Sequence, residues 1–261
     1  MDLGLAGQVA IVTGASKGIG LAITRVLADE GVTVVAGARE TSAELEALTR
    51  TGTVTYVAAD LGQPDGVAHL VDAAAGRGRL DILVNNVGAV TPRLDGFVAV
   101  TDEQWATTYT LNLMAAVRTT RAALPMMLAR GRGVIVCTSS VNAVLADPGV
   151  IDYSAAKAAL RSFCKSLSKE LGPKGIRVNT VSPGPVSTDL WLGAGGVAAA
   201  VSARQGTDPS AVAAAAARES ATGRFTRPSE VANLVAFLAS DVAGNITGAD
   251  VAIDGGLITT T

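Results

Sequence analysis

Short apolar runs alternate along the chain with segments whose apolar positions recur at helical spacing. Runs typical of strands buried on both faces lie at residues 8–13, 32–36, 54–59, 81–84, 133–137, 176–181 and 251–253. Between them, segments such as 21–28 and 65–75 predict helices. The sequence contains no internal repeat and no domain boundary. The alternation therefore predicts a single α/β domain over residues 1–261.

Two further segments, after residue 100, carry signals for helix starts and ends. Residues 101–104 form a capping box that opens a long helix, which we expect Pro125 to kink or end. Between residues 193 and 223 the composition shifts to alanine and glycine, with Asp208 and Pro209 as the cap and first turn of a short helix. Because alanine runs have little surface to bury, we interpret 193–223 as a mobile, substrate-binding flap and not as a linker.

Composition narrows the functional classes. Of 261 residues, 49% are hydrophobic and 17% charged, which suits one sizeable core. A net charge of -2 without a basic run argues against nucleic-acid binding. No apolar run approaches the ~18 residues of a membrane span and the N-terminus lacks a signal-peptide pattern, so we expect a cytoplasmic protein. Cys137 and Cys164 fit buried reduced thiols, and His69 has no partners for a metal site.

A glycine-rich turn follows the first apolar run. Residues 14–20, Gly-Ala-Ser-Lys-Gly-Ile-Gly, connect the strand at 8–13 to the helical segment at 21–28. This order puts free backbone N–H groups and the positive end of a helix dipole where a pyrophosphate can dock. The turn with its flanks therefore predicts a dinucleotide site.

The end of the second strand indicates which dinucleotide binds. An acid there would accept hydrogen bonds from a free ribose 2′-hydroxyl, but this chain has Ala38 and Arg39, with Lys17 in the glycine turn. A charge-assisted hydrogen bond of ~1.5–3 kcal/mol corresponds to roughly ten- to hundredfold in affinity. We therefore expect NADP; the alternative is that Arg39 is only a solvated residue at a helix start.

Other polar residues stand at strand ends or inside helices. Asp60 ends the third strand, where it either accepts a hydrogen bond from an adenine amino group or merely terminates the strand. Asn85 and Asn86 follow the fourth strand, where amide side chains can tie neighbouring strands together. Asn112 lies among apolar neighbours in a helix that gains nothing from asparagine, so it needs another reason.

Tyr153 and Lys157 are four residues apart, so they share one face of a helix, and we expect the ammonium to lower the pKa of the phenol. The fifth strand delivers Ser139 and Ser140 upstream, and either serine fits a strand end. A Tyr-x-x-x-Lys pair alone is a weak signal; its weight comes from the motifs around it.

Taken together, these motifs resemble the short-chain dehydrogenase/reductase family over the whole length of the chain. The matching motifs are residues 13–20, 85–88, Asn112, Ser140, Tyr153 with Lys157, Pro183-Gly184 and residues 254–256. The resemblance implies a Rossmann fold with a doubly wound, seven-stranded parallel sheet flanked by helices, and usually a homotetramer. One departure is Val87, where the family usually has alanine; the two extra methyls remove no chemistry.

The resemblance also implies residue roles. The catalytic set is Asn112, Ser140, Tyr153 and Lys157, with the family's spacing selecting Ser140 over Ser139. Tyr153 would protonate the carbonyl oxygen as general acid, Ser140 would orient that oxygen, and Asn112 would hold a water that relays protons through Lys157. The cofactor-binding set is Gly14, Ser16, Lys17, Gly18, Ile19, Gly20, Arg39, Asp60, Leu61, Asn86, Val87, Gly88, Tyr153, Lys157, Pro183, Gly184, Val186 and Thr188.

The substrate is the least specified part. Ser140, Asn142, Val144, Leu145 and Trp191 follow catalytic strand ends and are expected to border a mainly apolar pocket. We expect a small-molecule carbonyl or alcohol substrate and an NADPH-dependent oxidoreductase that reduces a ketone to a secondary alcohol. The alternatives are an NAD-dependent secondary alcohol dehydrogenase and a catalytically silent dinucleotide-sensing protein. The intact catalytic set argues against the sensor.

Overall fold

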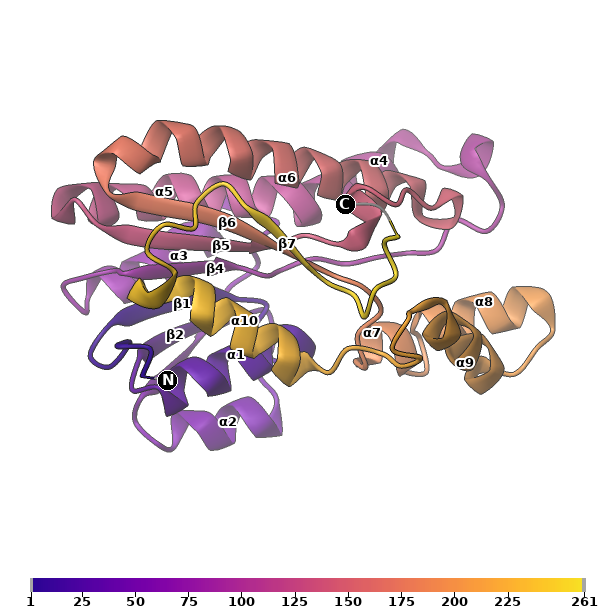
Figure 1. The fold of residues 1–261 in the computed structure, drawn as a ribbon, viewed down its shortest axis with the longest axis horizontal. Helices are drawn as coiled ribbons and strands as arrows, with labels where there is room; N and C mark the ends of the chain where they lie inside the picture. The colour runs from indigo at the N-terminus through magenta and orange to yellow at the C-terminus, as the bar shows by residue number, and fades with distance from the viewer. Residues whose placement is uncertain (1, 260–261) are drawn as a thin grey trace.

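A computed structural model describes residues 2–259 and contains one parallel sheet (Figure 1). Its strands are β1 (Val9–Thr13), β2 (Thr33–Ala38), β3 (Val54–Ala58), β4 (Ile82–Asn85), β5 (Gly133–Thr138), β6 (Ile176–Pro183) and β7 (Asp250–Ile253). They lie in the order β3-β2-β1-β4-β5-β6-β7, and every neighbouring pair is parallel. The expected doubly wound, seven-stranded sheet is confirmed.

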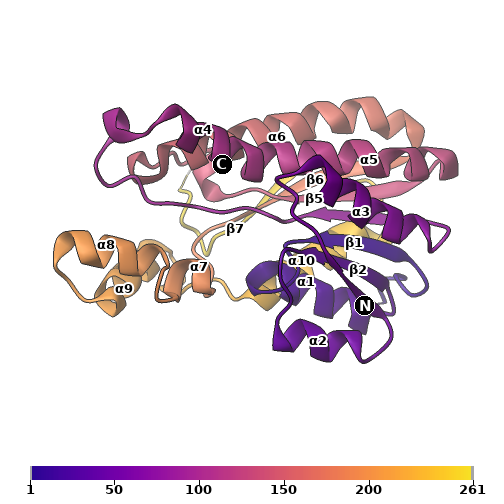
Figure 2. The same ribbon diagram turned by 180° about the vertical axis from the view of Figure 1, so that it is seen from behind.

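Helices cover both faces of the sheet (Figures 1 and 2). One face carries α1 (Gly18–Asp29), α2 (Ala43–Thr49) and α10 (Pro228–Ala239). The other carries α3 (Pro64–Ala75), α4 (Asp102–Tyr109), α5 (Ala115–Arg130) and α6 (Ile151–Leu171). Short 3-10 turns lie at Phe97–Ala99, Val141–Ala143, Pro148–Val150, Gly172–Lys174 and Asp241–Ala243. Because helices cover both faces, the central strands are apolar at nearly every position.

Two apolar layers hold these elements together. Ile23 and Leu27 of α1 pack with Val235 of α10 against one face of the sheet. On the other face, Leu70 of α3 and Leu160 of α6 belong to the second layer. Cys137 and Cys164 lie in that second layer as buried free thiols.

Of the two signals predicted for the long helix after residue 100, the capping box forms and Pro125 does not end the helix. The Thr101 side chain accepts from the backbone N–H of Gln104, whose side chain accepts from the N–H of Thr101, so the capping box is present. Pro125 does not end its helix, because α5 continues to Arg130 and closes at Gly131 with φ +62°. Buried Ala123 and Met127 on either side anchor α5 to the sheet despite the lost hydrogen bond.

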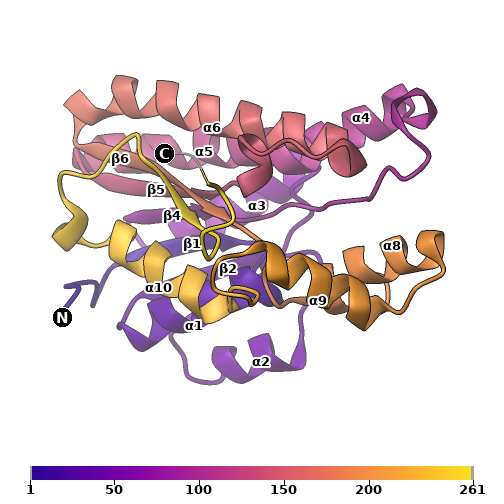
Figure 3. The ribbon, with the colours of Figure 1, turned by 45° about the vertical axis from the view of Figure 1, so that its right-hand side comes forward.

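The segment after β6 forms short helices that project to one side of the sheet (Figure 3). They are α7 (Asp189–Leu192), α8 (Val197–Gln205) and α9 (Pro209–Glu219). Asp208 caps α9 by accepting from the N–H of Ser210, and α9 has no buried residue. Among the described residues, no helix combines the length and hydropathy needed to cross a membrane.

Candidate active site

A cleft of about 850 Å³ opens at the carboxyl ends of the strands. The sheet order places β1 beside β4, so chain connections leave in opposite directions there and a crevice forms between them. Most of the residues that the sequence singled out line this cleft, Gly14 and Trp191 among them.

The glycine turn between β1 and α1 shapes one wall. Gly14 and Gly18 have φ of +66° and +56°, a conformation that side chains disfavour. A Cβ on Gly20 would collide with the carbonyl oxygen of Gly14, so Gly20 lets helix and turn pack closely. Lys17, at the start of α1, gives the helix no side-chain cap, and α1 has no acid in its first turn. This helix end fits a pyrophosphate.

The β2 end forms the adjoining wall. Ser16, Lys17 and Arg39 line the cleft with Glu40, an acid that the sequence reasoning did not weigh. The Ser42 hydroxyl donates to the Ser16 carbonyl at 2.7 Å and ties this wall to the glycine turn. Lys17 and Arg39 are both exposed. These two cations fit a 2′-phosphate.

The third strand contributes Asp60 and Leu61, which both line the cleft. Leu61 is buried, and the Asp60 carboxylate accepts from the N–H of Gly62 at 3.0 Å. The carboxylate therefore shapes its own turn as well as facing the cleft.

Asn86 ties three strand ends together. Its backbone N–H donates to the Thr13 hydroxyl at 2.8 Å, and its side chain donates to the Thr13 carbonyl at 3.0 Å. Its side-chain oxygen accepts from the Thr138 hydroxyl at 3.2 Å. The expectation that an amide ties strand ends is met at Asn86. Asn85 points into the core, where its Nδ2 donates to Thr120 at 2.9 Å and its Oδ1 has no partner.

Asn112 lies in a π-helical turn, Thr110–Met114, between α4 and α5. Its Nδ2 donates to the carbonyls of Ala89 at 2.8 Å and Thr108 at 3.0 Å. Its Oδ1 accepts from the Ala89 N–H at 3.2 Å. Gly88 fits beside it only without a side chain, because a Cβ would lie 2.8 Å from Oδ1. This accounts for an asparagine among apolar neighbours.

The two serines after β5 face different partners. The Ser139 hydroxyl donates to the Lys157 carbonyl at 3.3 Å and so contacts the backbone of α6. The Ser140 hydroxyl contacts Asn142, donating to its Oδ1 at 3.1 Å and accepting from its N–H at 3.2 Å. Ser140 also lies close enough to Tyr153 to lower the pKa of the phenol. This arrangement favours Ser140 as the substrate-facing serine.

Tyr153 and Lys157 lie on α6 at the centre of the cleft. Burial raises the pKa of Tyr153, and the nearby Ser140 side chain only partly opposes this. Lys157 is 3% exposed, its Nζ donates to the Thr138 carbonyl at 2.8 Å, and burial lowers its pKa to about 8. The expected lowering of the tyrosine pKa by Lys157 is wrong here, because burial dominates and the ammonium, 5.6 Å from the ring centroid, is directed at Thr138.

The exit of β6 closes the far wall, where Pro183, Gly184, Val186 and Thr188 line the cleft. A Cβ on Gly184 would lie 3.0 Å from Asp254, so the strand end packs tightly against β7. A Cβ on Gly18 would lie 3.2 Å from the Thr188 methyl, which brings this wall close to the glycine turn.

The residues expected to border the substrate lie mostly on the cleft, which is more apolar than polar. Asn142, Leu145 and Trp191 line it, but Val144 does not; that residue is 48% exposed. Val144 directly follows the 3-10 turn Val141–Ala143, whereas Leu145, which is equally exposed, lines the cleft. Acids also line the cleft, at Asp147, Asp189 and Glu219. Sequence reasoning missed Glu219 because nothing local to α9 indicates which of its faces meets the cleft.

Comparisons with known proteins match this architecture. The family model for enoyl-(acyl carrier protein) reductase matches residues 14–258. The chain is 36% identical to the uncharacterised oxidoreductase YvrD of Bacillus subtilis, over 99% of both proteins. It is 34% identical to the 3-oxoacyl-[acyl-carrier-protein] reductase FabG of Thermotoga maritima, over 97% of this chain and 99% of that protein. The crystal structure of L-sorbose reductase from Gluconobacter frateurii, complexed with NADPH and L-sorbose, is similar with a TM-score of 0.91 and 36% identity, covering 100% of both chains.

Proposed function

The chain belongs to the short-chain dehydrogenase/reductase family of oxidoreductases, and from this premise we propose that it is an NADPH-dependent reductase that converts a ketone to a secondary alcohol. One observation carries the proposal: a half-buried tyrosine and a buried lysine and serine line the same cleft as a glycine turn and two cations. The L-sorbose reductase complex, which holds NADPH, supports the choice of cofactor.

The residues of the cleft divide the chemistry between them. NADPH, when bound, supplies the hydride. Tyr153, whose raised pKa keeps the phenol protonated near neutral pH, donates the proton that the carbonyl oxygen needs. The Ser140 hydroxyl orients that oxygen and stabilises its developing charge. Lys157, with a pKa of about 8, is still mostly protonated at neutral pH and would hold ribose hydroxyls.

The glycine turn, Asp60, Leu61 and the β6 exit would hold the rest of the dinucleotide, with Arg39 and Lys17 at the 2′-phosphate. The flap at 193–223 would cover the substrate: Val197, Ala216 and Glu219 from this segment line the cleft. Its C-terminal end is tied to the sheet, because the N–H of Thr222 donates to the Gly255 carbonyl at 3.0 Å.

The acids Asp147, Asp189 and Glu219 extend the substrate classes worth testing to hydroxylated ketones, alongside simple ketones, β-keto esters and a β-ketoacyl thioester. Carboxylates accept hydrogen bonds from substrate hydroxyls. A homotetramer in a reducing cytoplasm fits the family and the two free thiols, and light scattering of the purified protein tests the tetramer.

The test is NADPH consumption with this panel, run beside Tyr153→Phe. We expect turnover of at least one ketone by the native enzyme, and loss of nearly all of it in the variant with NADPH binding retained. Tyr109→Phe is the matched control, because Tyr109 does not line the cleft. Wild-type turnover in Tyr153→Phe would overturn the assignment of the proton donor, and absence of turnover on every class would overturn the reductase.

A further inference from the structure

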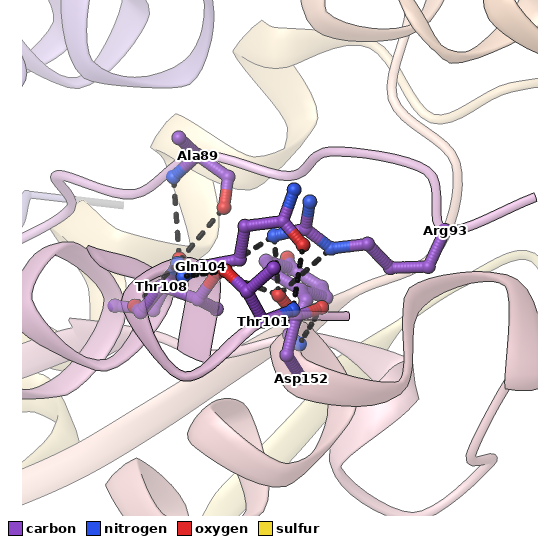
Figure 4. Close-up of polar contacts among 8 residues, drawn as sticks. Ala89, Arg93, Thr101, Gln104, Thr108 and Asp152 are labelled. Carbon is purple, nitrogen blue, oxygen red and sulfur yellow. Dashed lines mark hydrogen bonds and ion pairs between the residues drawn. The ribbon is translucent and has the colours of Figure 1, made fainter. Parts of the chain in front are cut away.

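A buried ion pair joins the start of α6 to the loop after β4. The Asp152 carboxylate is 1% exposed and the Arg93 side chain 11% exposed. Arg93 donates to Asp152 Oδ2 from Nη2 at 2.6 Å and from Nε at 3.0 Å, and the Thr108 hydroxyl donates to the same oxygen at 2.8 Å (Figure 4). A fork of two hydrogen bonds fixes direction as well as distance.

The pair lies where α6 lacks an ordinary cap. Val150, before the helix, makes no side-chain capping bond. Asp152 fills that role from inside the first turn, because its Oδ1 accepts from the N–H of Tyr153 at 2.9 Å. Arg93 adds a backbone contact, donating from its own N–H to the Gly149 carbonyl at 2.7 Å. Both the entry to α6 and the residue before Tyr153 are therefore held by one arginine.

The same network reaches the other functional elements. Thr108 accepts from Asn112 at its carbonyl while its hydroxyl donates to Asp152. Asn112 in turn binds Ala89, four residues before Arg93 in the same loop. The loop after β4, the π turn and the Tyr153 helix thus form one closed set of hydrogen bonds.

We infer that Arg93, Asp152 and Thr108 are positioning residues that fix the Tyr153 phenol relative to Ser140 and Lys157. The inference rests on the proposed role of Tyr153 as proton donor. Tyr153 is the third residue of α6, so a shift of the first helical turn moves the phenol directly. A misplacement of about 1 Å costs on the order of 10²-fold in rate.

The test uses a charge-balanced variant that can still pack, Arg93→Met with Asp152→Leu, since buried ion pairs replaced by apolar residues of similar volume usually fold. We expect kcat to fall roughly ten- to hundredfold with the KM for NADPH changed by less than about twofold. The pKa of Tyr153, followed by tyrosinate absorbance against Tyr153→Phe, should fall toward its ordinary value of about 10, since burial is what raises it.

The matched control is Arg132→Met with Asp241→Leu, an exposed pair at 2.7 Å, which should change neither kcat nor the Tyr153 pKa. A folded Arg93/Asp152 variant with native kcat and native Tyr153 pKa would overturn the inference. If that variant does not fold, Thr108→Val decides. It removes the hydroxyl's hydrogen bonds to Asp152 and Arg93 without changing charge, and we expect kcat to fall several-fold. A native kcat in Thr108→Val would contradict the positioning role.

The two proposals fail separately. If the native enzyme turns over no ketone, the proposed reductase activity is wrong. The tyrosinate titration needs no substrate, so it still reports whether Arg93 and Asp152 hold Tyr153 in its native position. An unchanged pKa would then reject the positioning role.

Discussion

Asn112 and Ala89 bind each other through two hydrogen bonds, one in each direction, at 2.8 and 3.2 Å. The asparagine amide thus pairs with both backbone groups of one residue, as a neighbouring strand would. The π turn aims this side chain at the loop, and Gly88 and Lys157 lie alongside.

Asn112→Leu should therefore reduce stability and activity together. The leucine removes the side-chain partner of the Ala89 N–H and carbonyl. Because Ala89 is exposed, water replaces part of these bonds, and we expect a loss of about 1 kcal/mol. Urea unfolding measures the loss, and kcat should fall with it because the loop beside Lys157 loosens. Asn245→Leu makes the same change at an exposed site and should alter neither quantity. A native free energy of unfolding in Asn112→Leu would mean that these hydrogen bonds make no net contribution to stability.

Ser140→Ala and Ser139→Ala separate two adjacent hydroxyls. We expect a loss of about 10²-fold in kcat for Ser140→Ala, the size seen when one donor to a developing oxyanion is removed. Ser139→Ala should cost less than about tenfold, since that hydroxyl contacts only the backbone of α6. Steady-state kinetics on one ketone decides, and the reverse order of losses would transfer the substrate-facing role to Ser139.

The central strands could be predicted from sequence because they are buried on both faces and so carry unbroken apolar runs, as at 133–137. The residues that line the cleft at strand ends followed from the parallel topology. A local sequence pattern does not show which distant residues meet in the fold. Arg93 and Asp152 lie 59 residues apart, so no motif spacing predicts their ion pair. Pro125 likewise predicts a helix end from sequence, because the packing that keeps α5 helical past it is tertiary.

The pKa of Tyr153 illustrates a second limit. A lysine four residues away favours the phenolate on a bare helix, and that argument needs only the sequence. The depth of burial is a property of the whole fold, and here it outweighs the neighbouring charge. The spacing placed Tyr153 and Lys157 on one helix, as in the structure, but predicted the wrong direction of the pKa shift.

Arg39→Glu should change which cofactor binds. The cation at the β2 end is lost and a carboxylate then repels a 2′-phosphate, so we expect NADPH affinity to fall roughly ten- to hundredfold while NADH affinity is retained or improved. Fluorescence titration with both cofactors measures this. Arg25→Glu, an exposed charge reversal outside the cleft, is the control. Equal losses for NADPH and NADH would reject the 2′-phosphate contact.

Carbonyl reduction should decline as pH rises through about 8, because the pKa of Lys157 is lowered to about 8 by burial. Below that pH the ammonium is present; above it the neutral amine forms and the cation near the phenol is lost. Tyr153, whose pKa is raised, stays protonated across this range and does not set the decline. The profile of kcat/KM against pH, which reports the free enzyme, measures the inflection. Lys157→Arg keeps a charge at all these pH values, so any activity it retains should show no inflection near 8. An inflection that persists in Lys157→Arg would assign the titration to another group in the cleft.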